Sequence, residues 1–404
     1  MIPRSPISVA DKAFPPHLWG VSPTDLEVPL SAFATPVVTL DDAAIDHNTT
    51  LMAAWARRHG FALAPHGKTT MAPALWRRLL DAGAWGITLA TGWQAQVAHA
   101  HGIPRVQLAA PLLDAAAWRW LRDARAGGFE LVCWADSSEA VARMSAQATS
   151  AASPPVPVLV ELGGQGGRTG ARSIAAAREV AEAIAAAPGL ALAGVAGYEG
   201  AIAHDRSSAS LAAVDAYLGR LAELSDAVRP LVGWGAPPLL SAGGSAYPDR
   251  VAAVLSGRSE TVVLRAGAYQ IHDDGFYAGI SPLRAELRSA MHAWARVLST
   301  PEPGFALLDA GRRDVSFDEG LPRLQAVHPE GVPRRDADAP VRALNDQHAF
   351  QAQPVDGPPL VVGDVVRLGL SHPCTVLDKW RRLPLVADAR ASDPVVIGAV
   401  DTWF

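Results

Sequence analysis

The sequence predicts a (β/α)8, TIM-like barrel with a second, mostly β domain. From about residue 60 to residue 270, eight short apolar runs alternate with Ala-rich segments. This alternation is typical of parallel βαβ units, and eight units in roughly 200 to 250 residues match the size of such a barrel. After about residue 285 the helical periodicity fades, and Pro, Gly and short β-type runs take over. An open doubly wound sheet is the alternative, since periodicity does not show whether a sheet closes.

The elements follow from the apolar pattern in chain order. The predicted barrel strands are 61–65, 86–90, 106–110, 129–135, 156–162, 192–198, 238–242 and 261–266. Helix formers with three-to-four spacing predict helices at 72–82, 92–101, 114–126 and 172–187. The β domain has strand candidates at 305–308, 360–362, 364–368 and 395–400, an exposed loop at 331–340, and an added N-terminal run at 34–40. We therefore expect a barrel over residues 36–285 and a β-rich domain made of residues 1–35 and 286–404.

The composition limits the classes of function. The formal net charge is −5 and no basic stripe is present, so we expect no nucleic-acid partner. Cys133 and Cys374 are the two cysteines and lie far apart, which argues against a disulfide framework. No apolar run of about 18 residues occurs, and the N-terminus lacks a signal-peptide pattern, so no membrane partner and a cytoplasmic location are expected.

Lys68 is the first candidate for chemistry. It follows the first predicted strand in the segment Pro65-His66-Gly67-Lys68-Thr69-Thr70, and barrel enzymes carry their catalytic residues at such strand ends. A lysine amine becomes a Schiff-base nucleophile when it is desolvated or lies beside other cations. Only Lys12 and Lys379 are further lysines. An ordinary exposed loop lysine is the alternative for the position taken alone.

The loops after the seventh and eighth strands are candidates for phosphate binding. They read Ser241-Ala242-Gly243-Gly244-Ser245 and Arg265-Ala266-Gly267-Ala268-Tyr269. Barrels often bind phosphate in these two loops, where Gly allows close backbone approach and Ser adds a hydroxyl donor. Two tight turns are the alternative. A reactive lysine together with a phosphate cradle suggests a cofactor with an aldehyde at one end and a phosphate at the other.

Three further side chains could complete this site. Arg168 follows a Gly-rich stretch after the fifth strand, which lacks the Walker spacing, and it could pair with an anionic oxygen. Tyr198 and His204 follow the sixth strand and could flank a flat ring. A surface arginine and packed core rings are the corresponding structural alternatives.

His372 and Cys374 form a candidate metal pair in the second domain. Residues two apart on extended backbone point the same way, and both types are good zinc ligands. A buried cysteine beside a hydrogen-bonded histidine is the structural alternative.

These motifs resemble those of the alanine-racemase-like, fold type III pyridoxal-phosphate enzymes, in the branch of D-serine dehydratases and D-threonine aldolases. The segment from Pro65 to Thr69 looks like the branch motif Pro-His-x-Lys-Thr, and the segment from Arg265 to Tyr269 is similar to Arg-Pro-Gly-x-Tyr. The stretches 308–311 and 316–322 resemble Asp-Ala-Gly and Ser-x-Asp-x-Gly-x-Pro. His372-Pro373-Cys374 looks like the His-x-Cys metal pair of the dehydratases, where the aldolases carry His-x-Asp. Ala64, Thr70 and Met71 stand where the branch usually has Arg, His and Lys, which leaves the substrate open.

The resemblance implies a site and a reaction. Lys68 would hold pyridoxal 5'-phosphate and act as the catalytic residue, and zinc or another divalent metal would bind His372 and Cys374. The residues implied in cofactor binding are His66, Lys68, Arg168, Tyr198, Ser241, Gly243, Gly244, Ser245, Gly267, Ala268 and Tyr269. The implied activity is dehydration and deamination of a D-serine-like β-hydroxy D-amino acid to a 2-oxo acid and ammonia, by a homodimer. The alternatives are a D-threonine-type retro-aldolase, a racemase with a second base, and a non-catalytic pyridoxal-phosphate-binding protein.

Overall fold

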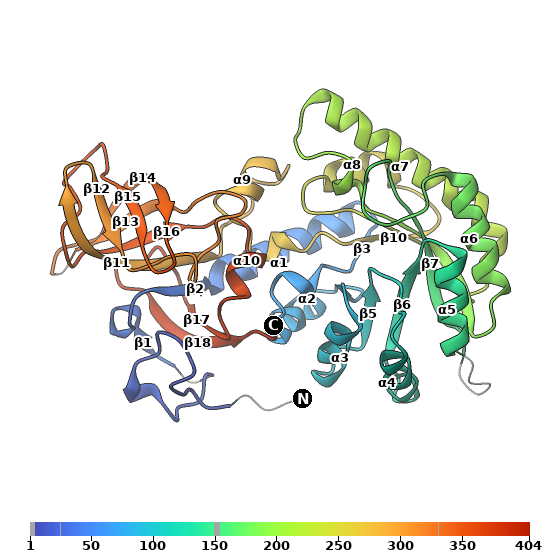
Figure 1. The fold of residues 1–404 in the computed structure, drawn as a ribbon, viewed down its shortest axis with the longest axis horizontal. Helices are drawn as coiled ribbons and strands as arrows, with labels where there is room; N and C mark the ends of the chain where they lie inside the picture. Colours follow the sequence, from blue (N-terminus) through green and yellow to red (C-terminus); the bar gives the residue numbers. More distant parts are fainter. Residues whose placement is uncertain (1–4, 25, 149–153, 330) are drawn as a thin grey trace. The chain divides into compact units, whose positions relative to one another are not determined.

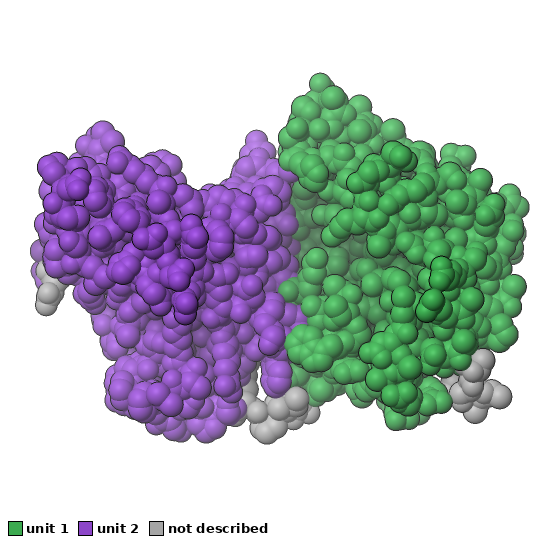
Figure 2. Space-filling view, viewed as in Figure 1, with its two compact units in different colours: residues 1, 52–68, 76–267 green, residues 2–51, 69–75, 268–404 purple. Residues whose placement is uncertain are grey.

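The computed structural model describes residues 5–24, 26–148, 154–329 and 331–404 (Figure 1). The chain forms two compact units, one with residues 52–68 and 76–267 and the other with residues 2–51, 69–75 and 268–404 (Figure 2). Helix α1 (Asp42–Arg58) begins in the second of these and ends in the first. We call them the barrel unit and the β unit. The sequence-based division at residues 36 and 285 stays a prediction about domains.

The barrel unit consists of eight parallel strands with helices between them (Figure 1). Its strands are β3 (Ala62–Leu63), β4 (Ile87–Leu89), β5 (Arg105–Leu108), β6 (Glu130–Ala135), β7 (Val156–Leu162), β8 (Leu190–Gly197), β9 (Leu239–Ala242) and β10 (Thr261–Leu264). Its helices are α2 (Pro73–Asp81), α3 (Gly92–Ala100), α4 (Ala115–Ala126), α5 (Ser138–Ala148), α6 (Ile174–Ala186), α7 (Ser208–Val228) and α8 (Pro248–Leu255), with 3-10 turns η4 (Glu199–Ala201) and η5 (Arg229–Leu231). The predicted alternation of strand and helix is confirmed.

The strand order β3-β10-β9-β8-β7-β6-β5-β4 is completed by contacts between β3 and β4. Trp85 N donates to Leu63 O (2.7 Å), Thr88 N donates to Pro65 O (2.9 Å), and His66 forms a parallel bridge with Thr88. Because parallel strands are covered on both faces, all seven residues of β7 are buried. Its one charged residue, Glu161, accepts a hydrogen bond from Thr169 Oγ1 (2.8 Å). The sheet is thus TIM-like, as predicted, rather than an open doubly wound sheet, and its strand C-terminal ends meet at one mouth.

Helix starts in the barrel unit are fixed by local caps. Thr91 accepts from Gln94 N before α3, Asp114 accepts from Ala116 N before α4, and Ser173 accepts from Ala176 N before α6. Each cap satisfies an N–H group that has no partner within its helix. Within the described residues, no helix combines the length and apolarity needed to cross a membrane.

The β unit is built on a ten-stranded sheet. Its strands are β1 (Val28–Pro29), β2 (Val37–Asp41), β11 (Met291–Glu302), β12 (Phe305–Leu308), β13 (Arg323–His328), β14 (Arg335–Leu344), β15 (Ala349–Ala352), β16 (Val365–Gly369), β17 (Arg382–Val386) and β18 (Val395–Asp401). Short helices complete it: α9 (Phe276–Ile280), α10 (Cys374–Leu377), η1 (Pro16–Leu18), η2 (Leu30–Ala32) and η6 (Ala268–Gln270), while η3 (Gly67–Thr69) passes from one unit to the other.

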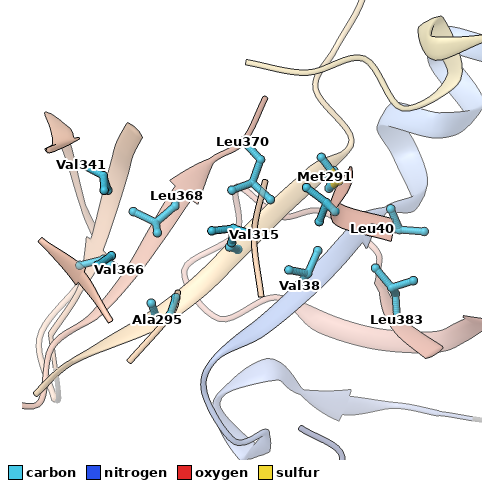
Figure 3. Packing of buried hydrophobic residues seen from close by; sticks show 14 of the residues in the cluster. Val38, Leu40, Met291, Ala295, Val315, Val341, Val366, Leu368, Leu370 and Leu383 are labelled. Carbon is cyan, nitrogen blue, oxygen red and sulfur yellow. The ribbon is translucent and has the colours of Figure 1, made fainter. Parts of the chain in front are cut away.

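Strand β11 joins two parts of this sheet. It pairs with β12 and with β16, which closes the ring β11-β12-β15-β14-β13-β16, and it also pairs with β2. Inside the unit, apolar side chains from the N-terminal strand and from the C-terminal strands pack together, among them Val38, Leu40, Met291, Leu368 and Leu383 (Figure 3). The expectation that the run at 34–40 joins the second domain is therefore confirmed.

Two local expectations for the β unit are wrong. Strand β14 begins at Arg335, inside the predicted loop 331–340, because polar side chains alternate with half-buried ones on a sheet with one solvated face. Residues 360–362 are not a strand, since a turn through Gly363 precedes β16.

Candidate active site

Lys68 lies in a tight turn directly after strand β3. Residues Gly67–Thr69 form the 3-10 turn η3, and the Lys68 side chain is exposed. Trp76 of α2 packs against this turn and donates its indole N–H to Gly67 O (3.1 Å). A Cβ atom on Gly67 would lie 2.6 Å from Trp76 Nε1, so only glycine fits here. The sequence thus places the lysine at the strand end, as predicted.

The charge around His66 shows which side chains gather at this strand end. Burial lowers the pKa of His66 well below its usual range, and the positive charges of Lys68, Arg265 and Arg168 lower it further. Those three cations come from the loops after β3, β10 and β7. The barrel mouth therefore holds a neutral imidazole among three cations, which is an environment suited to an anionic ligand.

The glycine loop after β9 already holds an anionic oxygen. Gly243 N and Gly244 N donate to the two carboxylate oxygens of Glu199, at 3.0 and 2.5 Å, and Glu199 is fully buried. Gly267 N donates to Ser245 Oγ (3.3 Å). These N–H groups thus have the geometry of an anion cradle, but Glu199 takes the acceptor position that we expected for phosphate at Gly243 and Gly244.

Close approach in this region depends on missing side chains. A Cβ on Gly267 would lie 2.6 Å from both the backbone N and the backbone O of His66. A Cβ on Gly244 would lie 2.8 Å from Tyr198 Cε2, and the Arg168 guanidinium carbon lies 5.0 Å from the centre of the Tyr198 ring. The structure therefore brings Arg168, Tyr198 and the two glycine loops together within the barrel unit.

Ser241 belongs to the barrel interior. It is buried within β9, where its hydroxyl oxygen accepts from Gln107 Nε2 (2.6 Å) and from Arg265 Nη1 (2.8 Å). Arg265 also donates to Gly197 O (2.5 Å), and its guanidinium carbon lies 4.8 Å from the Trp134 ring centre.

Several buried polar atoms of this interior have no partner in the described part of the chain. They are His66 Nδ1, Gln107 Oε1, Trp134 Nε1 and Arg265 Nε. Buried polar groups are normally hydrogen-bonded, so four orphaned atoms in one barrel interior indicate a place for a polar ligand. A flat, anionic, hydrogen-bonding cofactor such as pyridoxal phosphate fits this set of residues.

Ala268 and Tyr269 belong to the β unit, where they form the start of turn η6. Tyr269 is buried, and burial raises the pKa of its hydroxyl. His204 is exposed after η4. Their predicted roles beside a cofactor stay predictions.

His372 and Cys374 lie together, but on a backbone that differs from the expected one. His372 has φ +46°, and Cys374 starts helix α10 after Pro373, so the segment is not extended. The hydrogen bond with the Cys374 side chain, then the hydrogen bond and charge of Asp318, raise the pKa of His372 to about 9. The expected extended backbone is wrong, but the imidazole and the thiol still lie close together.

Two aspartates hold His372 in place. Asp318 Oδ2 lies 2.6 Å from His372 Nδ1 and Asp273 Oδ2 accepts from His372 N at 3.2 Å. A carboxylate behind one ring nitrogen is the usual support for a metal-binding histidine. Among the described residues no group of three or more His, Cys, Asp or Glu side chains is arranged to hold a metal ion.

The sequence analysis did not single out four residues that make contacts in these sites: Glu199, Arg265, Gln107 and Asp318. Arg265 and Asp318 lie inside the quoted motifs, which could have indicated a role for them. Glu199 and Gln107 contact partners more than forty residues away in the chain, at Gly243 and Ser241. Cys133 is free and buried in β6, and burial raises the pKa of its thiol to about 12.

A lysine at the end of the first strand of a parallel barrel, an anion cradle after the seventh and eighth strands, and a separate antiparallel β unit define the fold type III class of pyridoxal-phosphate enzymes. The chain belongs to the family of the alanine racemase N-terminal domain, whose family model matches residues 40–249. A second family model, "Putative serine dehydratase domain", matches residues 290–386. The predicted resemblance is confirmed.

Several of the similar proteins are named as aldolases or dehydratases, and others as alanine racemases. D-threonine aldolase from Arthrobacter sp is 27% identical over 90% of this chain and 92% of its own. The crystal structure of D-threonine aldolase from Filomicrobium marinum superposes with a TM-score of 0.76 at 24% identity, covering 93% of this chain and 98% of that one. The D-threo-3-hydroxyaspartate dehydratase from Delftia sp. HT23 gives a TM-score of 0.70 at 20% identity, covering 92% and 97%.

Proposed function

We propose that the chain is a pyridoxal-phosphate-dependent lyase of β-hydroxy D-amino acids, in which Lys68 holds the cofactor. The observation that carries the proposal is the convergence of Lys68, Arg168 and Arg265 on the neutral His66. The cations match the phosphate and the ring oxygen of the cofactor. The backbone N–H groups of the glycine loop after β9 already donate to Glu199 and are not part of this support.

The residues of the barrel unit have separate tasks in this proposal. The bound cofactor supplies an electron sink for the negative charge that develops at the substrate α-carbon. Lys68 Nζ would remove the α-proton as general base. Arg168 would pair with the ring oxygen of the cofactor. Ser245 and the backbone of Gly267 would support the phosphate.

The finer proposal is a zinc-assisted dehydratase that yields a 2-oxo acid and ammonia. His372 and Cys374 would hold the ion, and a soft Cys/His donor pair favours zinc. Zinc there would polarise the β-hydroxyl of the substrate so that it leaves. Asp318 keeps the imidazole oriented through Nδ1. Support for dehydration comes from Cys374, which stands where the aldolases of the resembling branch carry aspartate.

Aldol cleavage is the second candidate, because the 27% identical relative over 90% of the chain is a D-threonine aldolase. Incubation of the cofactor-loaded protein with D-serine, D-threonine and D-3-hydroxyaspartate separates the two reactions. A 2-oxo acid and ammonia indicate dehydration, whereas glycine and an aldehyde indicate cleavage. Exhaustive chelation should stop dehydration while the cofactor absorbance persists, and an unchanged rate would remove the metal from the proposal.

Lys68→Ala tests the cofactor site itself. We expect the variant to lose the visible absorbance of lysine-bound cofactor and all turnover, because no other amine replaces Nζ at this strand end. Lys12→Ala, which changes a lysine of the β unit, should keep both properties. Full activity of Lys68→Ala would end the proposal. A homodimer and a cytoplasmic location, implied by the resemblance and the composition, are further parts of it, and sedimentation of the purified protein tests the first.

A further inference from the structure

A cavity of about 750 Å³ opens in the β unit. Its walls come from the segment 30–37, from β11, from the residues on either side of the β13–β14 turn, and from residues 363–365 and 392–394. The volume falls within the range of roughly 300 to 1,000 Å³ that is typical of small-molecule pockets. His372, Cys374 and the barrel residues described above are not among its lining residues.

One wall of this cavity includes buried aromatic side chains. Phe33, Val37 and Trp294 line it and are buried. The Trp294 indole is fixed because its N–H donates to Thr39 Oγ1 (2.9 Å). A fixed aromatic wall stabilises an apolar or aromatic body of matching size without losing much side-chain freedom.

The rim of the cavity carries more positive than negative charge. Arg296 and Arg334 line it, and the single acidic lining residue, among those described, is Asp393. The Asp393 carboxylate accepts from Ser31 N (3.2 Å) and Ser31 Oγ (2.8 Å). Arg334 pairs through Nη2 with Asp336, yet its buried Nε has no partner within the described residues. A carboxylate in the cavity would meet two guanidinium groups.

His328 lines the same cavity with a neutral ring. Its Nδ1 lies 3.0 Å from Ser392 O, and because a carbonyl only accepts, Nδ1 carries the hydrogen. Burial, with the charges of Arg334 and Arg367, lowers the pKa of His328, so the ring is neutral and Nε2 is an acceptor. This Nε2 is buried and lacks a partner in the part of the chain that the structure describes. The ring packs edge-on against Trp294 at 5.0 Å.

We propose that this cavity is a second, non-catalytic binding site for a small carboxylate with an aromatic or branched apolar side chain. The carboxylate contacts Arg296 and Arg334, and the side chain packs on Trp294 and Phe33. The site is independent of the proposed lyase activity, because it uses residues of the β unit alone.

Calorimetric titration of the cofactor-loaded protein with phenyllactate tests the proposal. This probe has the carboxylate and the aromatic body, and it has no amine that could condense with the cofactor. We expect a dissociation constant below about 1 mM. 3-Phenylpropane-1,2-diol, in which a hydroxymethyl group replaces the carboxylate, should bind at least tenfold more weakly. Equal affinity for the two probes, or no binding of either, would overturn the proposal.

Variants locate the binding. The double change Arg296→Ala and Arg334→Ala should weaken phenyllactate binding at least tenfold. Arg342→Ala, which removes an exposed arginine of β14 outside the cavity lining, should leave it unchanged. Lys68→Ala should bind phenyllactate with the same affinity as the unchanged protein. If Lys68→Ala loses this binding, the measured heat comes from the barrel unit, and the second site is refuted. If the double variant does not fold, the difference in affinity between the two probes on the unchanged protein still tests the proposal.

Discussion

His372 is held in an uncommon conformation by groups outside the candidate metal pair. Its φ of +46° lies in the left-handed region, which residues other than glycine rarely occupy. Asp273 accepts from the backbone N–H and Asp318 contacts the ring nitrogen, so the main chain and the side chain are both fixed. Such local strain persists where surrounding contacts determine it, and it gathers at functional positions.

Asp318→Ala is therefore expected to weaken zinc binding. Without the carboxylate the imidazole can rotate, and loss of such a supporting group typically costs about 10- to 100-fold in metal affinity. Competition with a chromophoric chelator measures the affinity directly, without relying on activity. Asp338→Ala, which removes an exposed carboxylate paired with Arg323 in the same unit, is the matched control. Unchanged zinc affinity in Asp318→Ala would contradict the role.

At the scale of elements, the loop after β10 is packed so closely against the turn after β3 that glycine is required. Gly267 lies against the backbone of His66, which cannot move like a flexible side chain. The same packing aligns the lysine turn after β3 with the loop after β10, because His66 N also donates to Arg265 O (3.2 Å).

Gly267→Ala should lower both stability and cofactor affinity. An added Cβ at 2.6 Å from backbone atoms forces a backbone shift, and overpacking of this kind costs about 1 to 3 kcal/mol. Thermal unfolding and a titration with pyridoxal phosphate measure the two effects. Gly219→Ala in α7 meets nothing within 4 Å and should be neutral or slightly stabilising, since alanine favours the helix. A melting point of Gly267→Ala equal to that of the unchanged protein would refute the packing argument.

The sequence predicts an element well where its residues are buried along the whole length, and poorly where burial changes along the element. All eight barrel strands lie within the predicted runs or overlap them, because two-sided burial makes each run continuously apolar. Strand β11 begins with five buried residues from Met291, becomes mostly exposed from Arg296 to Glu302, and gave no clear run. The positions of the lysine and glycine motifs could be predicted, since each follows a strand. The acceptor role of Glu199 could not, because it depends on a loop 44 residues further along the chain.

At the scale of the whole molecule, buried histidines make stability depend on pH. His292 in β11 is 5% exposed, and burial, with the charges of Arg367 and Arg390, lowers its pKa to about 3. The folded protein therefore keeps this ring neutral while the unfolded chain protonates it near its ordinary value of 6.5. The stabilisation is fully present above that value and is lost as the pH falls toward 3.

His292→Gln should flatten this part of the pH dependence. The difference in unfolding free energy between the unchanged protein and the variant should shrink between pH 6.5 and about 3, by an amount on the order of 5 kcal/mol. Denaturant unfolding at a series of pH values measures it. His348→Gln changes an exposed histidine and should keep the full dependence. Parallel curves for His292→Gln and the unchanged protein would show that this residue does not contribute.

The β unit takes its strands from the two ends of the chain. Strand β2, at residues 37–41, pairs with β11 and β17, which begin at residues 291 and 382. During translation, residues 37–41 leave the ribosome long before these partners have been made. The apolar strand β2 therefore stays unpaired while more than two hundred residues are synthesised and the parallel strands of the barrel unit assemble. Because the segment stays unpaired until β11 and β17 have been made, nascent chains of this protein should depend on chaperone binding around residues 37–41. A premature stop codon before β17 would likewise leave the segment without that partner strand.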